Sequence, residues 1–449
     1  MAETRERTLA VAEAVRDRLG PDRVILDPAA LVKLSSDWSK MSPVLAEKVP
    51  AGRYVADVVV CPRTIAEVTA VLALAYGADV PVTPRGAGTG NYGQATPFDG
   101  GIILDLRELN QIRMGADGSV VAGAGARLTA VDEVARAAGR DLWIFPSTKG
   151  STVGGFIAGG SAGTGTIEHG STTDGFVRAL TVAPMDGSGE VFTVTGEDAL
   201  PYVHAYGVTG IVVEAELATD PAREWTALYA GFATWEAMVE VHRSLLDLPV
   251  LPRLASGDEP ALVPTLPARV RLDPTRFSLR VIAERSTVDE IARRVAAAGG
   301  EVVATFEEYA ASDRLSGMSY NHPVYFLQRG HPERSWFHME TGSPIYWTDP
   351  DAVRAIYDGE VYLHLELMGS APLAMVVADY VSEEQVLAGL DRFDALGVGV
   401  HSPHQWYVDR NVETVRRVAA VRDPKGLLNP GKLLPELAPV DTRVNIGVR

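Results

Sequence analysis

The sequence predicts an α+β protein with two structural units, and three observations support this prediction. The chain has 449 residues, more than one ordinary hydrophobic core takes up. Segments with the periodicity of strands and of helices alternate along most of it. Glycine is concentrated in two stretches, 84–93 and 150–165, and the composition changes at the segment TDPAR, 219–223. We therefore expect domains over 1–220 and 221–395, followed by a C-terminal segment over 396–449.

In the first domain, the pattern predicts a strand, a helix and a strand over 55–83. The helix should begin after Thr64, which forms a capping-box pattern with Glu67, and end at Gly77. Further strands are expected at GGIILDL and SVVAGAGA, with a short helix from about 129 to Gly139. FVRALTVAPMDGSGEVFTV predicts a hairpin that turns at DGSG, and GIVVEAEL predicts the last strand of this unit.

TDPAR is expected to be the linker into the second domain. Strands and helices should alternate from 224 to about 395, as in FSLRVIAE, TVDEIARRVAAAGG and EVVATF. In the C-terminal segment, NVETVRRVAAVR predicts a helix that ends before Pro424. The first 20 residues predict an amphipathic helix.

Composition narrows the class of protein. Hydrophobic residues make up 46% and charged residues 22%, as in folded soluble proteins, and no apolar run approaches the roughly 20 residues that span a bilayer. The N-terminal 20 residues carry charge where a signal peptide has its apolar region, so we expect a cytoplasmic protein without membrane contact. A net charge of −17 disfavours nucleic-acid binding. The single cysteine, Cys61, excludes an internal disulfide and a multi-cysteine metal site.

The stretch PRGAGTGNYG, 84–93, follows a strand and suggests a phosphate-binding loop. A Rossmann dinucleotide site requires a helix to begin inside the glycine run, but the next residues, NYGQATPFDGG, have no helical period. A glycine loop without a helix can still direct its backbone N–H groups at one anion. The alternative is that the glycines only form tight turns.

The second stretch, GSTVGGFIAGGSAGTG, favours the anion-binding interpretation. Val153, Phe156 and Ile157 interrupt the glycines at positions typical of buried side chains, so the segment is not a flexible linker. Glycine inside a buried segment indicates that another body approaches the backbone closely. Two such stretches about 60 residues apart predict one extended cofactor lying between two lobes.

These segments resemble, in order and spacing, the FAD-linked oxidases of the vanillyl-alcohol oxidase and p-cresol methylhydroxylase (PCMH) type. The resemblance rests on PRGAGTGNYGQATP, GGIILDLREL, PSTKGSTVGGFIAGGSAGTGTIEHGSTTDGFV, DGSGEV, GVTGIVVEAEL and DPKGLLNPGKL. It is specific over about 50–220 and 396–435, and looks strongest toward the glycolate oxidase and D-lactate dehydrogenase branch. It implies a two-lobed PCMH-type FAD-binding domain, an α+β substrate-cap domain over 221–395, and a tail that returns to the flavin.

The resemblance also implies which residues hold FAD. The first loop would bind the phosphates through Arg85, Gly86, Ala87, Gly88, Thr89, Gly90 and Asn91. The rest of the cofactor would contact Ser147, Thr152, Val153, Gly154, Gly155 and Ala162, with Ile211 near the adenine and His169 flanking the flavin. The first loop has no histidine at the position used for covalent attachment, so noncovalent FAD is expected, although attachment through a cap histidine or tyrosine stays open.

Two branch-specific patterns are incomplete. Metal-dependent 2-hydroxyacid dehydrogenases carry a His-x-Gly-Asp-Gly-Asn-x-His run and a Glu-His-Gly run, whereas this chain has YLHLELMGS and GVHSPHQWYVD. His364 and His401 match, but their partners do not. The phenol-oxidising branch has a Tyr-Arg-Thr-His run, of which only His404 matches. The histidines of the segment 319–347 lack a ligand spacing, so we expect no metal.

Oxidation of an alcohol carbon delivers a hydride to flavin N5 and needs a base for the hydroxyl proton, a task that suits histidine. His401 is the expected base, with His404 and Tyr407 as further catalytic candidates. The alternative for either histidine is a hydrogen-bonded packing role. Tyr320, Asn321, His322 and Trp406 are the expected substrate contacts, in a setting rich in aromatic residues.

The sequence thus predicts an FAD-dependent oxidoreductase that removes a hydride from a hydroxyl-bearing or phenol-activated carbon of a small aromatic or apolar substrate. One alternative is a metal-independent D-2-hydroxyacid dehydrogenase, in which Arg329 or Arg334 would anchor the substrate carboxylate. Another is a flavin-binding or electron-transfer subunit without its own substrate. Oxygen or another acceptor would reoxidise the flavin, and related proteins suggest a homodimer.

Overall fold

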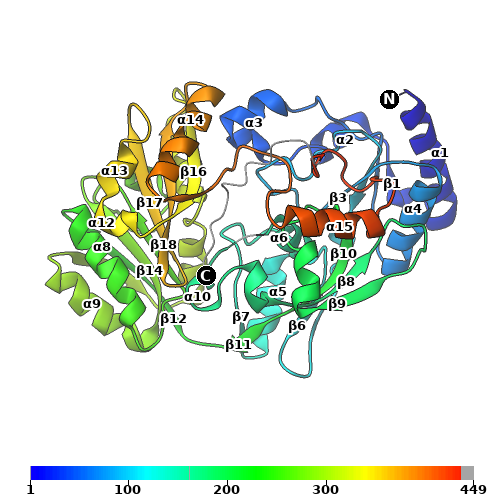
Figure 1. Cartoon of the computed structure of the whole chain (residues 1–449). Helices are drawn as coiled ribbons and strands as arrows, with labels where there is room; N and C mark the ends of the chain where they lie inside the picture. The colour runs from blue at the N-terminus through cyan, green and yellow to red at the C-terminus, as the bar shows by residue number, and fades with distance from the viewer. Residues whose placement is uncertain (1, 161, 436–449) are drawn as a thin grey trace.

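The computed structural model describes residues 2–160 and 162–435 (Figure 1). The chain begins with helix α1 (Ala2–Leu19), followed by α2 (Pro28–Leu34) and α3 (Pro43–Lys48). A four-stranded sheet has the order β1-β2-β4-β3, in which β2, β4 and β3 are parallel and β1 is antiparallel. Its strands are β1 (Val24–Ile25), β2 (Val58–Val60), β3 (Val82–Arg85) and β4 (Ile102–Asp105).

The helix expected after Thr64 is confirmed as α4 (Ile65–Gly77). The Thr64 hydroxyl accepts a hydrogen bond from the Glu67 backbone N–H at 3.1 Å, which satisfies a donor of the first helical turn. Val68 and Val71 on α4 pack with Val11 and Val15 of α1 over the sheet. Between β3 and β4, residues 86–101 form turns and bends without a helix, as the sequence predicted.

A second, antiparallel sheet has the order β5-β6-β10-β8-β9 and completes the first domain. Its strands are β5 (Ile112–Met114), β6 (Val120–Gly123), β8 (Val177–Ala183), β9 (Phe192–Thr195) and β10 (Ile211–Leu217). The expected hairpin that turns at DGSG is confirmed by the pairing of β8 with β9. The helices of this part are α5 (Leu128–Ala137), α6 (Val153–Gly159) and α7 (Thr166–His169).

The expected linker is not a free connection. Part of TDPAR forms β11 (Thr219–Pro221), which pairs with β7 (Arg140–Leu142). The Arg140 guanidinium also binds the Thr219 side chain and carbonyl, which holds this segment against the first domain.

The cap contains one eight-stranded antiparallel sheet in the order β15-β12-β14-β13-β17-β18-β16-β19. Its strands are β12 (Trp225–Phe232), β13 (Leu254–Asp258), β14 (Phe277–Glu284), β15 (Glu301–Phe306), β16 (Trp336–Gly342), β17 (Val361–Met368), β18 (Ala371–Asp379) and β19 (Gly399–His401). Its helices are α8 (Trp235–Ser244), α9 (Val288–Ala297), α10 (Tyr309–Ser316), α11 (His322–Gly330), α12 (Ile345–Thr348), α13 (Pro350–Arg354) and α14 (Glu383–Ala395). Separate hydrophobic clusters cover the two sheet faces. The sheet therefore extends past 395, to His401.

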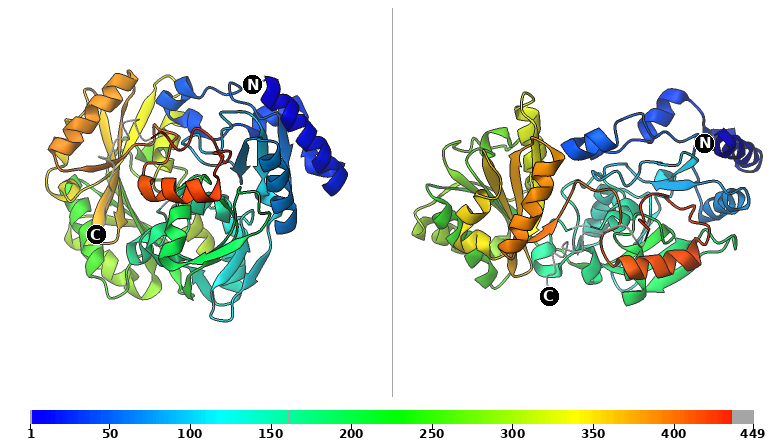
Figure 2. Two further views of the ribbon diagram at one scale, coloured as in Figure 1. Left: turned by 45° about the vertical axis from the view of Figure 1, so that its right-hand side comes forward. Right: turned by 45° about the horizontal axis from the view of Figure 1, so that its top comes forward.

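The chain returns from the cap to the first domain through α15 (Val412–Arg422), as Figure 2 shows in red. Leu428 then forms a parallel bridge with Val82 of β3. The Asn429 amide donates to the carbonyls of Gln94 and Tyr206, and buried Lys432 donates to the Gly93 carbonyl. The tail thus contacts the chain before the first glycine loop, at Val82, and at the end of the loop, at Gly93 and Gln94. The expected C-terminal segment also includes 436–449, which lie outside the described residues.

The observed architecture is the α+β fold predicted from the sequence. A screen of the described helices for membrane-spanning length and hydropathy finds none that qualifies.

Candidate active site and cofactor cavity

A cavity of about 680 Å³ lies between the first domain and the cap. Its wall is formed by the first glycine loop, the second glycine stretch, the start of β10, the turn before α11, and residues of β16 and β19. The volume falls in the range of small-molecule and cofactor sites. The parts that the sequence singled out are therefore brought to one cavity.

All seven expected residues of the first loop line this cavity: Arg85, Gly86, Ala87, Gly88, Thr89, Gly90 and Asn91. A Cβ on Gly86 would lie 2.0 Å from the Thr152 Oγ1, and a Cβ on Gly88 would lie 1.9 Å from the Arg85 guanidinium. Gly88 also has a φ of +67°, which favours glycine. The buried Arg85 guanidinium donates to the Ser36 carbonyl at 2.9 Å. The loop thus combines close backbone approach with one cation, as an anion cradle requires.

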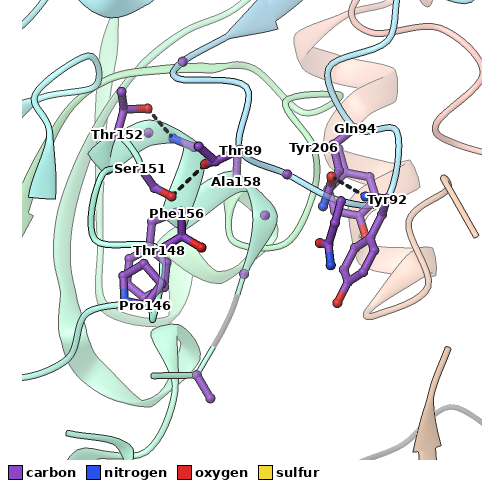
Figure 3. Close-up of a pocket in the computed structure, with 18 of the residues that line it drawn as sticks. Thr89, Tyr92, Gln94, Pro146, Thr148, Ser151, Thr152, Phe156, Ala158 and Tyr206 are labelled. Carbon is purple, nitrogen blue, oxygen red and sulfur yellow. Dashed lines mark hydrogen bonds between the residues drawn. The ribbon is translucent and has the colours of Figure 1, made fainter. Parts of the chain in front are cut away.

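The second glycine stretch lies against the first and lines the same cavity. Thr89 and Ser151, one from each stretch, join their hydroxyls at 2.7 Å, and Figure 3 shows this contact with Thr152 beside it. A short helix, α6, begins inside the stretch, and the Thr152 side chain accepts from the Gly155 N–H at its start. The cavity is lined by five of the expected residues here, Ser147, Thr152, Gly154, Gly155 and Ala162, and by Ile211. Val153 is buried in the neighbouring core instead.

Cross-strand pairing places a carboxylate beside the expected base. Glu340 of β16 and His401 of β19 occupy paired positions, and the His401 Nδ1 lies 2.9 Å from the Glu340 Oε2. Tyr92 from the first loop and Asn321 from the cap both donate to the other oxygen, Oε1. Burial alone would raise the pKa of Glu340, but His401, His338 and Tyr92 hold it far below its usual value. The side chain is therefore an anion that orients His401.

The expected cap contacts Tyr320, Asn321 and His322 also line the cavity. Tyr320 has a φ of +53°, and its N–H donates to Glu366 while its hydroxyl donates to the Gly163 carbonyl at 3.0 Å. The His322 ring lies between the Gly317 carbonyl, 2.6 Å away, and the Thr148 hydroxyl, 2.9 Å away. Burial lowers the pKa of His322. These fixed partners indicate a rigid wall.

Three other candidates are not brought to the cavity. After β19 the chain turns, and His404 packs against Phe337 and His338 with its Nδ1 2.7 Å from the Ser42 hydroxyl. Burial lowers the pKa of His404 to about 3, so its ring is neutral there. The Trp406 ring packs against the rings of Phe98 and Tyr407. Neither Trp406 nor Tyr407 borders the cavity. The geometry gives His404 the packing role that the sequence left as an alternative.

Several residues of the site were not foreseen: His204, Tyr206, Glu340, Asp409 and Arg410. The Asp409 carboxylate lies between two histidines, 2.9 Å from the His204 Nε2 and 3.4 Å from the His401 Nε2. Burial opposes its ionisation, but His401 and His204 hold the pKa of Asp409 well below its usual value. A sequence signal existed, because Asp409 and Arg410 follow the VHSPHQWYV segment directly.

The charges of the cavity wall differ from expectation. Arg334 pairs with Glu360 and Asp379 on the outside of the cap, and Arg329 is exposed, so neither borders the cavity. Arg410 does, and within the described part of the chain its guanidinium has no hydrogen-bond or ion-pair partner. His364, which matched the metal-dependent pattern, is buried inside the cap sheet between Asp258 and Glu366, away from the cavity.

Comparison with known proteins agrees with this geometry. Residues 56–195 match the family model of an FAD binding domain. The chain is 31% identical over 206 residues to a D-lactate dehydrogenase of Archaeoglobus fulgidus, covering 42% of this chain and 46% of that protein. It is 28% identical over 226 residues to the glycolate oxidase subunit GlcD of Bacillus subtilis, covering 48% of each. These matches thus span about half the length of the relatives.

A longer match is to a D-2-hydroxyglutarate dehydrogenase of Xanthomonas citri, 26% identical and covering 92% of this chain and 94% of that protein. Among solved structures, an alkyldihydroxyacetonephosphate synthase superimposes with a TM-score of 0.72 at 16% identity, covering 91% of this chain and 83% of the other. That likeness concerns the fold. The cavity fits the FAD that the family model implies, since both glycine-rich stretches and the Arg85 guanidinium line it.

Proposed function

We propose, from the premise that this chain belongs to the FAD-linked oxidases with a PCMH-type FAD-binding domain, that it oxidises the CH–OH group of a small 2-hydroxycarboxylic acid. The names of the matched relatives favour this reaction over oxidation of an aromatic or phenolic substrate. The expected aromatic substrate is therefore the second candidate.

The observation that carries the proposal is Arg410. A carboxylate substrate needs a cation in the cavity, and a guanidinium binds a carboxylate through two parallel hydrogen bonds. Arg85 is the other cavity arginine that we identify, but it lies in the phosphate cradle and already donates to the Ser36 carbonyl. Arg410 borders the same cavity as His401 and has no hydrogen-bonding partner among the described residues, so it is available to a substrate.

The chain would hold FAD with the backbone of the first loop and with Arg85 at its phosphates, and with the second stretch and Ile211 along the rest. Bound FAD supplies the acceptor of the hydride. Of the expected catalytic residues, His401 borders the cavity and is our proposed acceptor of the hydroxyl proton. Its Nδ1 is engaged by Glu340 at 2.9 Å, which leaves the more loosely held Nε2 for that proton.

The test is anaerobic reduction of the FAD-bound protein by a set of alcohols. The reduction is detected as loss of the yellow flavin absorbance. D-lactate, glycolate and D-2-hydroxyglutarate should bleach the flavin, whereas benzylic alcohols and phenols without a carboxylate should not. Bleaching by the aromatic set alone would support the second candidate. FAD that no alcohol reduces would support a flavin-binding subunit.

Arg410 is tested with a matched pair of variants. Arg410→Met should raise the substrate concentration needed for half-maximal reduction by about 100-fold or more, since a charge-assisted pair contributes several kcal/mol when one partner is removed. Arg329→Met removes an exposed guanidinium of the cap outside the cavity and should change nothing. Equal behaviour of both variants would remove the basis of the proposal.

A further inference from the structure

Four buried or half-buried titratable side chains form a continuous row beside the cavity: His204, Asp409, His401 and Glu340. The His204 Nε2 lies 2.9 Å from the Asp409 Oδ1, the His401 Nε2 lies 3.4 Å from the Asp409 Oδ2, and the His401 Nδ1 lies 2.9 Å from the Glu340 Oε2. The row begins in the first domain, crosses the C-terminal segment and ends on the cap sheet. The reaction proposed above assigns no role to His204 or Asp409.

The backbone is strained in order to place His204. Its φ is +54°, and Tyr206 two residues later has a φ of +51°, although side chains other than glycine rarely adopt this region. A Cβ on Gly160 would lie 2.3 Å from the His204 Cβ, so Gly160 provides the space for this histidine. Strained residues of this kind persist where surrounding contacts over-determine them, and they concentrate at functional sites.

The partners of His204 fix its orientation. Its Nδ1 faces the carbonyls of Gly159 and Gly160, at 2.6 Å and 3.2 Å, and its Nε2 faces Asp409. The ring therefore holds one oxygen of Asp409 in place. The Gln405 amide donates to the other oxygen at 2.8 Å, the one that also faces His401. Asp409 is thus fixed from two sides with its second oxygen toward the proposed base.

We propose that Asp409, held in place by His204, stabilises the protonated form of His401 after His401 has taken the hydroxyl proton of the substrate. This inference rests on the proposed function. In the step, the C–H electron pair leaves the substrate carbon as a hydride to FAD and the O–H proton moves to the His401 Nε2. The C–O single bond becomes the C=O bond of the 2-oxo acid. Asp409 and Glu340 then face the two N–H groups of the imidazolium.

The charges of the row favour one proton. Glu340 and Asp409 are anionic, and Arg410, which borders the same cavity, is cationic, so the row and Arg410 together carry −1 when both histidines are neutral, and one proton neutralises them. The His204 Nε2, the His401 Nε2 and the Asp409 carboxylate also lie within 4.8 Å of one another, as metal ligands would. With Arg410 counted in the set, one proton makes the set neutral, whereas a divalent ion would bring it to +1. We therefore assign this position to the proton that His401 takes from the substrate, and we include metal in the test.

Several titratable or charged groups surround His401. Its neighbours are Glu340 and His338 from β16, Tyr92 from the first loop, His204 from the segment before β10, and Asp409 after β19. Tyr206 and Arg410 line the same cavity. Replacing Asp409 by asparagine removes its charge and keeps its shape, so it isolates the effect of this one carboxylate on His401. An opposite charge at this distance typically moves a titration midpoint by one to three pH units.

The test compares Asp409→Asn, His204→Asn and the double variant in the FAD-bound protein by the rate of anaerobic flavin reduction against pH. Asparagine tolerates the left-handed backbone at position 204. Asp409→Asn should slow reduction about tenfold or more and move the acid limb of the profile about one unit or more to lower pH. His204→Asn should slow reduction less. Because His204 acts through Asp409, the double variant should be no slower than Asp409→Asn alone.

The matched control is Asp220→Asn, which changes a carboxylate 3.3 Å from the His169 Nε2 and outside the cavity. It should leave the profile unmoved. An unmoved acid limb in Asp409→Asn, or fully additive slowing in the double variant, would overturn the proposal. So would about one equivalent of a divalent metal in the purified protein that both single variants lose.

Failure of the proposed function has a different signature. If no hydroxy acid reduces the flavin, the imidazole ¹⁵N resonances of His401 can still be titrated in the FAD-bound protein. A lower midpoint in Asp409→Asn than in the unmodified chain would then support the coupling and reject only the substrate. An equal midpoint would reject the coupling itself.

Discussion

Replacing Gly86 by alanine should weaken FAD binding severely. The new Cβ would lie 2.0 Å from the Thr152 Oγ1 and 3.2 Å from its Cβ, far inside van der Waals contact. Thr152 is buried and caps α6. Moving its side chain would break the capping hydrogen bond, at a cost of about 1 kcal/mol. It would also distort the packing of the buried neighbours, at a cost of about 1–3 kcal/mol. If the empty variant relieves this strain by shifting the loop, FAD binding has to restore it at about 2–4 kcal/mol, which raises the FAD dissociation constant by about 30-fold to several hundred-fold.

The assay is titration of the apoprotein with FAD, followed by flavin fluorescence. Gly77→Ala is the matched control, because a Cβ there meets no atom within 4 Å at the end of α4. Thr152→Ala combined with Gly86→Ala removes the colliding hydroxyl and should recover part of the lost affinity. If Gly86→Ala bound FAD as tightly as the unmodified chain, the first loop would not be the phosphate cradle.

Three further predictions concern the cofactor, a packing histidine and a buried lysine. Acid precipitation of the purified protein should leave the yellow colour in the supernatant, because FAD is expected to be noncovalent; colour in the pellet would contradict this. His404→Asn should lower the free energy of unfolding by about 1–3 kcal/mol, as loss of a buried hydrogen-bonded group does, while the pH profile of flavin reduction stays unchanged. A changed profile would give His404 a role in the reaction. Burial lowers the pKa of Lys432 to about 7, whereas an unfolded lysine titrates near 10.4. Between these values the unfolded chain binds the extra proton, so stability from this group should rise with pH, by at most about 1.4 kcal/mol per unit. Urea unfolding at pH 6 and pH 9 should show this rise in the unmodified chain and less of it in Lys432→Met; an identical rise in both would refute the assignment.

That the first loop borders the cavity could be predicted from the sequence because the loop is one continuous segment. Every residue of 85–91 was expected at the cofactor, and all seven line the cavity, as consecutive residues that begin at the end of β3. Val153 was an exception for a simple reason. It lies inside α6, where successive side chains point in different directions, and a helix within the second stretch was not expected.

The acidic partners of His401 could not be predicted, because long-range pairing brings them there. Glu340 lies 61 residues before His401 and meets it only through the register of β16 with β19. Asp409 and His204 lie 205 residues apart and meet because the tail folds back onto the first domain. His204 also occupies a left-handed backbone position, which no local propensity favours.

The two histidines of VHSPHQWYVD differ because β19 ends between them: His401 lies on the strand and borders the cavity, whereas His404 lies beyond it and packs in the core. His401 is the last residue of β19, and pairing with Glu340 sets its direction toward the cavity. A slip of one residue would place Val400 there instead and turn His401 to the other face. Since β19 is a three-residue edge strand, few backbone bonds fix this register, and the contacts of His401 with Glu340 and Asp409 help to hold it. His404, past the strand end, follows the turn to Ser42 and Phe337. The contacts that orient the proposed base therefore also keep the edge strand in register, so the charge pattern of the site and the local fold depend on each other.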